Sequence, residues 1–237
     1  MNWRLLALNF LIAFPGVADE FQSANALYDA GKFGAATAAY EAITPKTAAV
    51  YFNLGNAHYR QEQLGLAVLN FERARQLAPR DPDVLANLRF AEARLGVAEI
   101  NQPGSAVRAG WGSVVASRTL SEWGVIEVAG IWFAVLAAAG WLWWRRGRFG
   151  LGIAFVAGIV WVLFAGSALV WQATRSPAAV AVAKCEARFA PLATATVHFV
   201  VPEGTKVALL EDRGAWWFVE RADGRRGWVL ANSVRLV

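Results

Sequence analysis

The chain has 237 residues, of which 57% are hydrophobic, and it carries a formal net charge of +5. That apolar fraction exceeds the usual share in a soluble protein, so we expect a membrane-embedded portion. The positive charge does not form one basic face, because part of it lies in the short stretch Arg145-Arg146-Gly147-Arg148, which argues against nucleic acid binding. Cysteine occurs once, at Cys185, which excludes an intramolecular disulfide and leaves a thiol or cysteine-zinc mechanism without its residues.

Residues 1–18 are typical of a signal peptide. Arg4 precedes an apolar run from Leu5 to Phe14, and the small residues Gly16 and Ala18 occupy the two positions that signal peptidase reads. The run is too short to span a bilayer comfortably. We therefore expect cleavage after Ala18, and the alternative is an uncleaved anchor. In either case the following segment is exported.

Residues 19–100 contain a 34-residue period, in which Asn53-Leu54 recurs as Asn87-Leu88. One unit carries an aromatic residue, a Leu-Gly pair, small alanines and a closing proline, in the order Tyr51, Leu54, Gly55, Ala67, Phe71, Ala74 and Pro79. This pattern resembles the tetratricopeptide (TPR) repeat, in which small residues let helices approach and proline ends the second helix. A shorter copy begins at Asn25 and a partial one covers Asp83 to Gly96, so we predict an all-α TPR solenoid of about two and a half units.

The TPR resemblance implies a binding groove for a peptide or protein. In such arrays the first helix of each unit lines a concave surface, where asparagine side chains hold the backbone of an extended peptide. The resemblance places Asn25 and Asn56 at the groove asparagine position. The other candidates nearby are Asn53, Tyr59, Arg60, Asn87 and Arg94. Because the third copy has Phe90 where that asparagine would fall, a helical partner is an open alternative to an extended peptide.

Residues 101–123 are expected to form a juxtamembrane tether, either an interfacial helix or a plain linker. Two apolar stretches follow, at residues 124–144 and 149–171, and each is long enough to cross a hydrocarbon core of about 30 Å. The arginine-rich loop 145–148 between them is expected in the cytoplasm, with tryptophans beside it at the interface. The pattern predicts a transmembrane hairpin with both flanking domains in the periplasm.

Few side chains offer chemistry beyond binding. His58 and His198 lie in different predicted domains without a second ligand at metal spacing, and no phosphate loop or hydrolase motif is present. Glu127, near the outer end of the first apolar stretch, is either a proton or partner contact or a solvated side chain. Cys185 is either a small strand residue or the site of an intermolecular disulfide. We expect no catalytic residue, no metal and no cofactor.

Residues 178–237 change to short alternating runs separated by turns, which predicts a small all-β barrel. The expected strands cover residues 180–186, 194–201, 206–210, 216–220 and 227–230. The order of Gly204, Trp216-Trp217 and Gly227-Trp228 resembles a bacterial SH3 domain. The resemblance places Trp216 at the ligand-stacking position of the groove, but Ala231 and Ser233 stand where the family's groove has proline and tyrosine. Trp216 is therefore either a groove residue or a core residue.

The order of signal peptide, TPR units, membrane hairpin and SH3-like barrel resembles the BatE family of aerotolerance-operon proteins over essentially the whole chain. The resemblance implies a multidomain, non-catalytic inner-membrane scaffold that works with von Willebrand factor A domain membrane proteins and a MoxR-type ATPase. Our leading hypothesis is that its TPR groove binds envelope proteins. The alternatives are a cell-wall sensor or anchor whose SH3-like domain binds peptidoglycan, and a regulator of an envelope enzyme.

Overall fold

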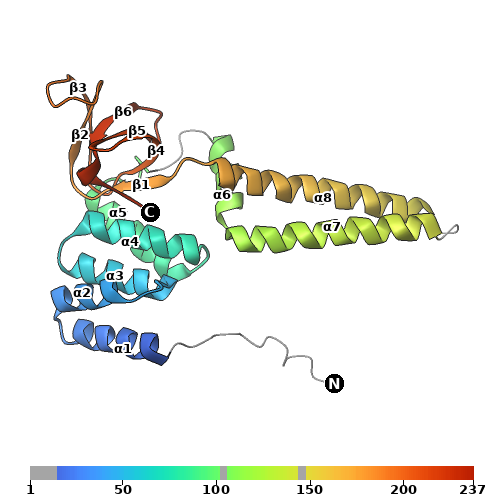
Figure 1. Ribbon diagram of the computed structural model, residues 1–237, viewed down its shortest axis with the longest axis horizontal. Helices are drawn as coiled ribbons and strands as arrows, with labels where there is room; N and C mark the ends of the chain where they lie inside the picture. Colours follow the sequence, from blue (N-terminus) through green and yellow to red (C-terminus); the bar gives the residue numbers. More distant parts are fainter. Residues whose placement is uncertain (1–14, 102–105, 144–147) are drawn as a thin grey trace.

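The computed structural model describes residues 15–101, 106–143 and 148–237 of the chain. The helices are α1 (Pro15–Asp29), α2 (Phe33–Ala42), α3 (Ala48–Arg60), α4 (Leu64–Leu77), α5 (Pro82–Leu95), α6 (Ala106–Ala116), α7 (Leu120–Trp143) and α8 (Arg148–Thr174). The strands are β1 (Ala178–Ala181), β2 (Cys185–Arg188), β3 (Val197–Val201), β4 (Lys206–Arg213), β5 (Trp216–Arg221), β6 (Arg226–Leu230) and β7 (Val234–Leu236), with a 3-10 turn, η2 (Ala231–Ser233), before β7. Figure 1 shows α1 to α5 stacked as an array, the β-sheet domain beside α4, and the hairpin of α7 and α8 projecting away from both.

Parts of two predictions fall outside the described residues. The predicted signal peptide covers residues 1–18, and the description begins at Pro15, the first residue of α1. The predicted cytoplasmic loop covers residues 145–148, of which only Arg148 is described, as the first residue of α8. Cleavage after Ala18 and the cytoplasmic position of the loop therefore remain sequence-based predictions.

Local sequence specifies both ends of α5, the helix predicted to begin the third unit. Asp81 Oδ1 accepts hydrogen bonds from the backbone nitrogens of Asp83, over 2.9 Å, and Val84, over 3.2 Å, and Pro82 stands in the first turn. The helix ends at Leu95 and is capped by Gly96, whose φ of 67° lies in the left-handed region that glycine tolerates best. The helix is therefore encoded by its caps as well as by its apolar pattern.

Close packing between consecutive helices holds the array together. Gly55 of α3 faces the ring of Phe71 of α4, and a Cβ atom at Gly55 would lie 2.7 Å from that ring. Phe52 packs on the same ring with 5.9 Å between ring centroids, and Phe71 is only 1% exposed. His58 is also buried, with Nδ1 2.7 Å from Gln63 Oε1. The close approach of helices expected at Gly55 is present.

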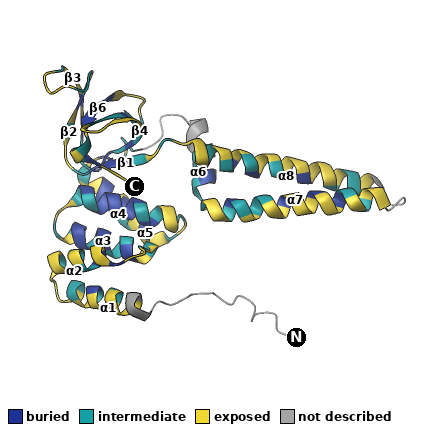
Figure 2. Cartoon of the chain, in the orientation of Figure 1, coloured by how far each residue is buried: buried dark blue, intermediate teal, exposed yellow. Residues whose placement is uncertain are grey.

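The α7–α8 hairpin consists of two helices long and apolar enough to cross a membrane, with mean hydropathies of 1.9 and 2.4. Only 11% and 17% of their most apolar windows are buried within the protein. Figure 2 shows exposed residues along both helices, whereas the array and the sheet have buried interiors. A core helix of a soluble protein would bury such a surface, so this exposure favours membrane association.

Helix α7 begins at Leu120 rather than at the predicted residue 124. Thr119 and Glu122 form a reciprocal cap: Glu122 N donates to Thr119 Oγ1 over 3.2 Å, and Thr119 N donates to Glu122 Oε2 over 2.9 Å. The apolar run alone did not reveal this start. The predicted tether at residues 101–123 contains α6, so this segment is partly helical rather than a plain linker.

The C-terminal sheet has seven antiparallel strands in the order β3-β2-β6-β5-β4-β1-β7. The strand predicted at residues 180–186 is instead two strands, because β1 pairs with β4 and β7 whereas β2 pairs with β3 and β6. The core of the sheet is built mainly from small and branched side chains. Its members are Ala179, Ala181, Ala187, Phe199, Val201, Val207, Val219, Val229 and Val234. A small antiparallel β domain was predicted, and the structure contains one.

Candidate functional site

Paired asparagines join the first, third and fifth helices of the array, and we call these four residues the asparagine ladder. Asn53 Nδ2 donates to Asn25 Oδ1, and Asn87 Nδ2 donates to Asn56 Oδ1, each over 2.9 Å. Tyr40 OH also donates to Asn25 Oδ1, over 2.6 Å. Burial raises the pKa of Tyr40 above its ordinary value of 10.0, so the hydroxyl keeps its proton and remains a donor.

The asparagine ladder leaves hydrogen-bonding groups of both kinds unused. Among the described residues, no hydrogen bond uses the amide nitrogens of Asn25 and Asn56 or the side-chain oxygens of Asn53 and Asn87. All four residues are half-buried and so reach the surface of the array. Donors and acceptors that alternate along a surface complement a peptide backbone, which presents N–H and C=O groups in alternation.

A second cluster lies beside the ladder at the end of α5. The Arg94 guanidinium donates to Tyr59 OH over 2.9 Å and to Glu62 Oε2 over 2.6 Å, and these hydrogen bonds raise the pKa of Arg94. Phe90 packs on the Tyr59 ring with 5.7 Å between centroids and is 63% exposed. The cluster therefore offers an exposed aromatic surface beside a cation.

Arg60 lies apart from the other predicted groove residues. Its guanidinium sits 4.8 Å from the centre of the Phe33 ring, at the start of α2. The ladder and the Arg94 cluster instead connect α1, α3 and α5. All predicted groove residues except Arg60 thus take part in contacts that join α1, α3 and α5.

Trp216 begins β5 and lies on the outer face of the sheet. Side chains alternate along a strand, and Trp217 and Val219 belong to the core, so Trp216 and Phe218 face the other way. Of the two readings of Trp216, groove or core, the structure supports the surface position. Trp217 is half-buried and packs against the core of the domain.

The residues around Trp216 form an outer aromatic face, which comprises Trp216, Phe218, Trp228 and Arg213. The rings of Phe218 and Trp228 lie 5.0 Å apart between centroids, and the Arg213 guanidinium lies 4.8 Å from the centre of the Trp228 ring. Leu230, 44% exposed, pairs with Trp216 across the strands and extends this face. Sequence reasoning named only Trp216, although the alternation along β5 could have identified Phe218.

Comparison with known families identifies the C-terminal domain. A family model described as a variant SH3 domain matches residues 201–237, from the last residue of β3 to the end of the chain. The C-terminal domain is SH3-like. No family model of TPR repeats or of the BatE family matches the chain. No curated protein matches the chain.

A buried ion-pair cluster joins the array to the SH3-like domain, and we call it the junction cluster. Lys206 Nζ lies 2.9 Å from Glu72 Oε1 and 3.0 Å from Glu92 Oε1, and these carboxylate side chains are only 3% and 10% exposed. Burial alone would raise the pKa of Glu72, but Lys206 and Arg75 outweigh it and hold that pKa below 4.5. Burial alone would lower the pKa of Lys206, but the two carboxylates raise it above 10.5.

Backbone contacts complete this junction. Asn101 Oδ1 accepts from Lys206 N over 2.8 Å, while Asn101 Nδ2 donates to Glu92 Oε1 over 2.8 Å and to Gly204 O over 3.1 Å. Gly65 N donates to Glu203 Oε1 over 2.6 Å. No local pattern indicates this cluster, because Glu72 and Lys206 stand 134 positions apart.

The two histidines and the cysteine of the chain have ordinary packing contacts where the structure describes them. In residues 15–101, 106–143 and 148–237, no group of three or more His, Cys, Asp or Glu side chains could hold a metal ion. His198 stacks on Phe189 at 4.3 Å between centroids, and its Nδ1 lies 3.1 Å from Arg226 O. Cys185 is half-buried and packs against the core of the SH3-like domain.

Cys185 is expected to react slowly with electrophiles in the folded protein. Burial raises the pKa of its thiol from 9.0 to about 11, so the thiolate fraction near pH 8 falls about 100-fold. Alkylation of the full chain by iodoacetamide at pH 8, followed by mass spectrometry with and without denaturant, measures this ratio. Equal rates in the two conditions would contradict the burial argument and would restore the intermolecular disulfide as a serious alternative.

Proposed function

We propose that the chain is a non-catalytic scaffold of the bacterial inner membrane that binds an extended segment of an envelope protein along α1, α3 and α5. In this proposal residues 19–100 form a TPR-like solenoid, and the α7–α8 hairpin crosses the membrane with loop 145–148 in the cytoplasm. The solenoid and the SH3-like domain, residues 178–237, then both face the periplasm. The exposed apolar hairpin and the arginines of its loop support this arrangement.

The asparagine ladder is the observation that carries the proposal. Its inner hydrogen bonds hold the four side chains in fixed positions across three helices. Its unused amide nitrogens and oxygens can pair with the carbonyl and N–H groups of a peptide laid across the helices. Exposed Phe90 and Tyr59 beside the ladder add apolar contact area for a side chain of that peptide.

The partners in this proposal are membrane proteins with von Willebrand factor A domains and a MoxR-type ATPase, in a complex that serves aerotolerance or stress. The support is the order of segments along the chain, which resembles the BatE family. The junction cluster adds a physical reason for a scaffold, because it fixes the SH3-like domain at a set position on the array.

In the double variant Asn25→Asp with Asn56→Asp, we expect the amount of captured envelope protein to fall by about tenfold or more, because each lost hydrogen bond costs about 1 kcal/mol of binding free energy. Aspartate keeps the oxygen that accepts from Asn53 or Asn87, so the ladder's inner bonds survive while the unused donors disappear. The measurement is crosslinking and affinity capture of the full-length protein from membranes. Asn232→Asp, at an exposed position in η2, is the matched control and should capture normally.

The outer aromatic face favours a second candidate function, the binding of peptidoglycan by the SH3-like domain. Trp216 and Phe218 are half-buried aromatic residues at this face, with Arg213 beside them and buried Trp228 beneath, which suits a cell-wall ligand. If the double aspartate variant captures normally while Trp216→Ala abolishes capture and the binding of purified peptidoglycan, the outer aromatic face is the working surface. The asparagine ladder would then be structural.

A further inference from the structure

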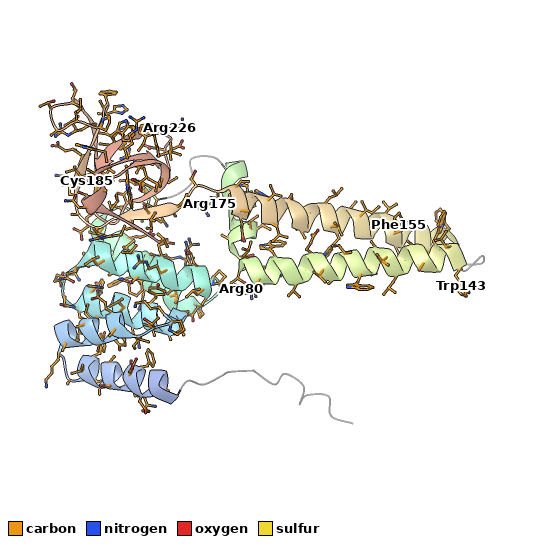
Figure 3. All side chains as sticks on the ribbon, viewed as in Figure 1. Arg80, Trp143, Phe155, Arg175, Cys185 and Arg226 are labelled. Atoms are coloured by element: carbon orange, nitrogen blue, oxygen red, sulfur yellow. The ribbon has the colours of Figure 1, made fainter. Side chains whose placement is uncertain are left out.

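One carboxyl group of the α7–α8 hairpin lacks a partner. Glu127 stands roughly 10 Å along α7 from Leu120, at 1.5 Å per residue, and the stretch from Trp123 to Trp143, labelled in Figure 3, is otherwise uncharged. Its Oε2 atom is buried and makes no hydrogen bond among the described residues. A Cβ atom at Gly166 of α8 would lie 3.6 Å from Glu127 Oε1, so the carboxyl group occupies space that the glycine leaves open.

Three donors of the hairpin are bonded elsewhere. Trp161 Nε1 faces Ile126 O over 3.4 Å, and Ser167 Oγ donates to Phe164 O over 2.7 Å. Gln172 Nε2 donates to Val115 O over 3.0 Å. A carboxyl group within the hydrocarbon region costs several kcal/mol unless it finds a donor. Since none of the described residues donates to Glu127 Oε2, a second protein can supply the donor.

Glu127 stands at one end of an apolar groove between the two helices, which we call the hairpin groove. Its lining residues are Ile131, Ala134, Val135, Ala138, Ala139, Leu142, Phe155, Ile159, Val162 and Leu163. On a helix, positions four apart share a face, so Glu127 extends the α7 row of Ile131 and Val135. Gly166 extends the α8 row of Ile159 and Val162 in the same way. Alanines in the lining let another helix backbone approach closely.

We propose that the hairpin groove receives a transmembrane helix of a partner protein, and that a lysine or arginine of that helix donates to Glu127. The proposal rests on the membrane insertion of the hairpin proposed above. Charge complementarity identifies the occupant, because the groove is apolar along its length and the Glu127 carboxyl group stands one helical turn before its first α7 residue, Ile131. A second copy of this chain is disfavoured, because a copy inserted in the same direction would bring Glu127 to Glu127, and α7 and α8 carry no basic residue except Arg148 at the opposite end.

The test uses the full-length protein in phosphatidylcholine vesicles with a photoreactive phenylalanine at Val135, in the hairpin groove. The probe is a synthetic oligoleucine transmembrane peptide with one lysine at the depth of Glu127. Two further peptides are controls, one with the lysine at the bilayer centre and one without lysine. We expect about 3- to 20-fold more adduct with the first peptide, the range that one interhelical hydrogen bond supplies. The matched control position is Phe133, equally exposed but outside the groove, which should show no preference.

Glu127→Leu should abolish the preference, and Glu127→Gln should reduce it, because the amide oxygen still accepts. Equal adducts with all three peptides, or a preference that survives Glu127→Leu, would overturn the proposal. Adducts between two copies at Val135 would show that a second copy occupies the groove. Adducts with lipid alone would show that lipid occupies it, and either result would contradict the proposal. Protease protection of the hairpin in the same vesicles tests insertion separately. A hairpin that is digested there would contradict the proposed insertion in the membrane.

Discussion

Lys206→Met is expected to release the SH3-like domain from the array at a cost of about 3–5 kcal/mol, which corresponds to a factor of about 100 or more in the opening equilibrium. The variant leaves Glu72 and Glu92 buried without their shared cation, and only Arg75 still faces Glu72. Amide hydrogen exchange at Gly65 and at position 206 measures the effect, because both amides are bonded across the junction.

The controls separate charge from packing. Lys184→Met removes an exposed lysine from the same domain and should change exchange little. The triple variant Glu72→Met, Glu92→Met and Lys206→Met replaces the whole cluster by apolar side chains and should recover most of the protection. If Lys206→Met exchanges like wild type, the junction cluster does not hold the two domains together.

The pH dependence of the same exchange follows from the two pKa directions. The pKa of Glu72 is held below 4.5, so its contribution is complete above about pH 4.5 and is lost as pH falls through the lower folded value. The pKa of Lys206 is raised above 10.5, so its contribution is complete below about pH 10.5 and is lost as pH rises through the higher folded value. Protection at the junction should therefore be flat between these limits.

Phe71→Ala is expected to destabilise the array by about 3–5 kcal/mol, the usual cost of removing a buried phenylalanine. Phe71 fills the space beside Gly55 and belongs to a cluster that also contains Leu88 of α5 and Val180 of β1. The cavity would therefore loosen three helices and the edge of the SH3-like domain. Amide hydrogen exchange along α3 and α4 is the measurement, because α7 and α8 do not contribute to it.

The control for this prediction is Phe90→Ala, which removes the same side chain from a position that is 63% exposed. Its effect on stability should stay within about 0.5 kcal/mol. Comparable losses in the two variants would show that Phe71 is not the packing centre of the array. A loss confined to α4 would show that the array does not unfold as one unit.

Local patterns were sufficient wherever neighbouring residues decide the structure. The period around Asn53-Leu54 predicted helices, Asp81 and Gly96 set the ends of one of them, and the alternating runs near the C-terminus predicted short strands. The capping pair Thr119 and Glu122 begins α7 four residues before the predicted start, because hydropathy does not register polar capping residues.

The candidate site also depends partly on local sequence and partly on tertiary packing. The position of the asparagines in the period indicated the face on which they lie, but the pairing of Asn25 with Asn53 and of Asn56 with Asn87 needed the packed helices. Arg60 was expected in the groove because it stands near Asn56 in sequence, and its contact with Phe33 placed it elsewhere. Trp216 and Trp217 could be told apart only once the strand's inner face was known.

The sequence by itself determined the periodic helices, the two apolar helices and the SH3-like strands, because periodicity, capping and hydropathy act over a few neighbouring residues. The tertiary structure alone decided that Lys206 meets Glu72 and Glu92, and that Glu127 Oε2 has no donor among the described residues. These contacts depend on which surfaces come together across large sequence separations. A buried charge is stabilised or left unpaired by its spatial neighbours, and no local pattern records them.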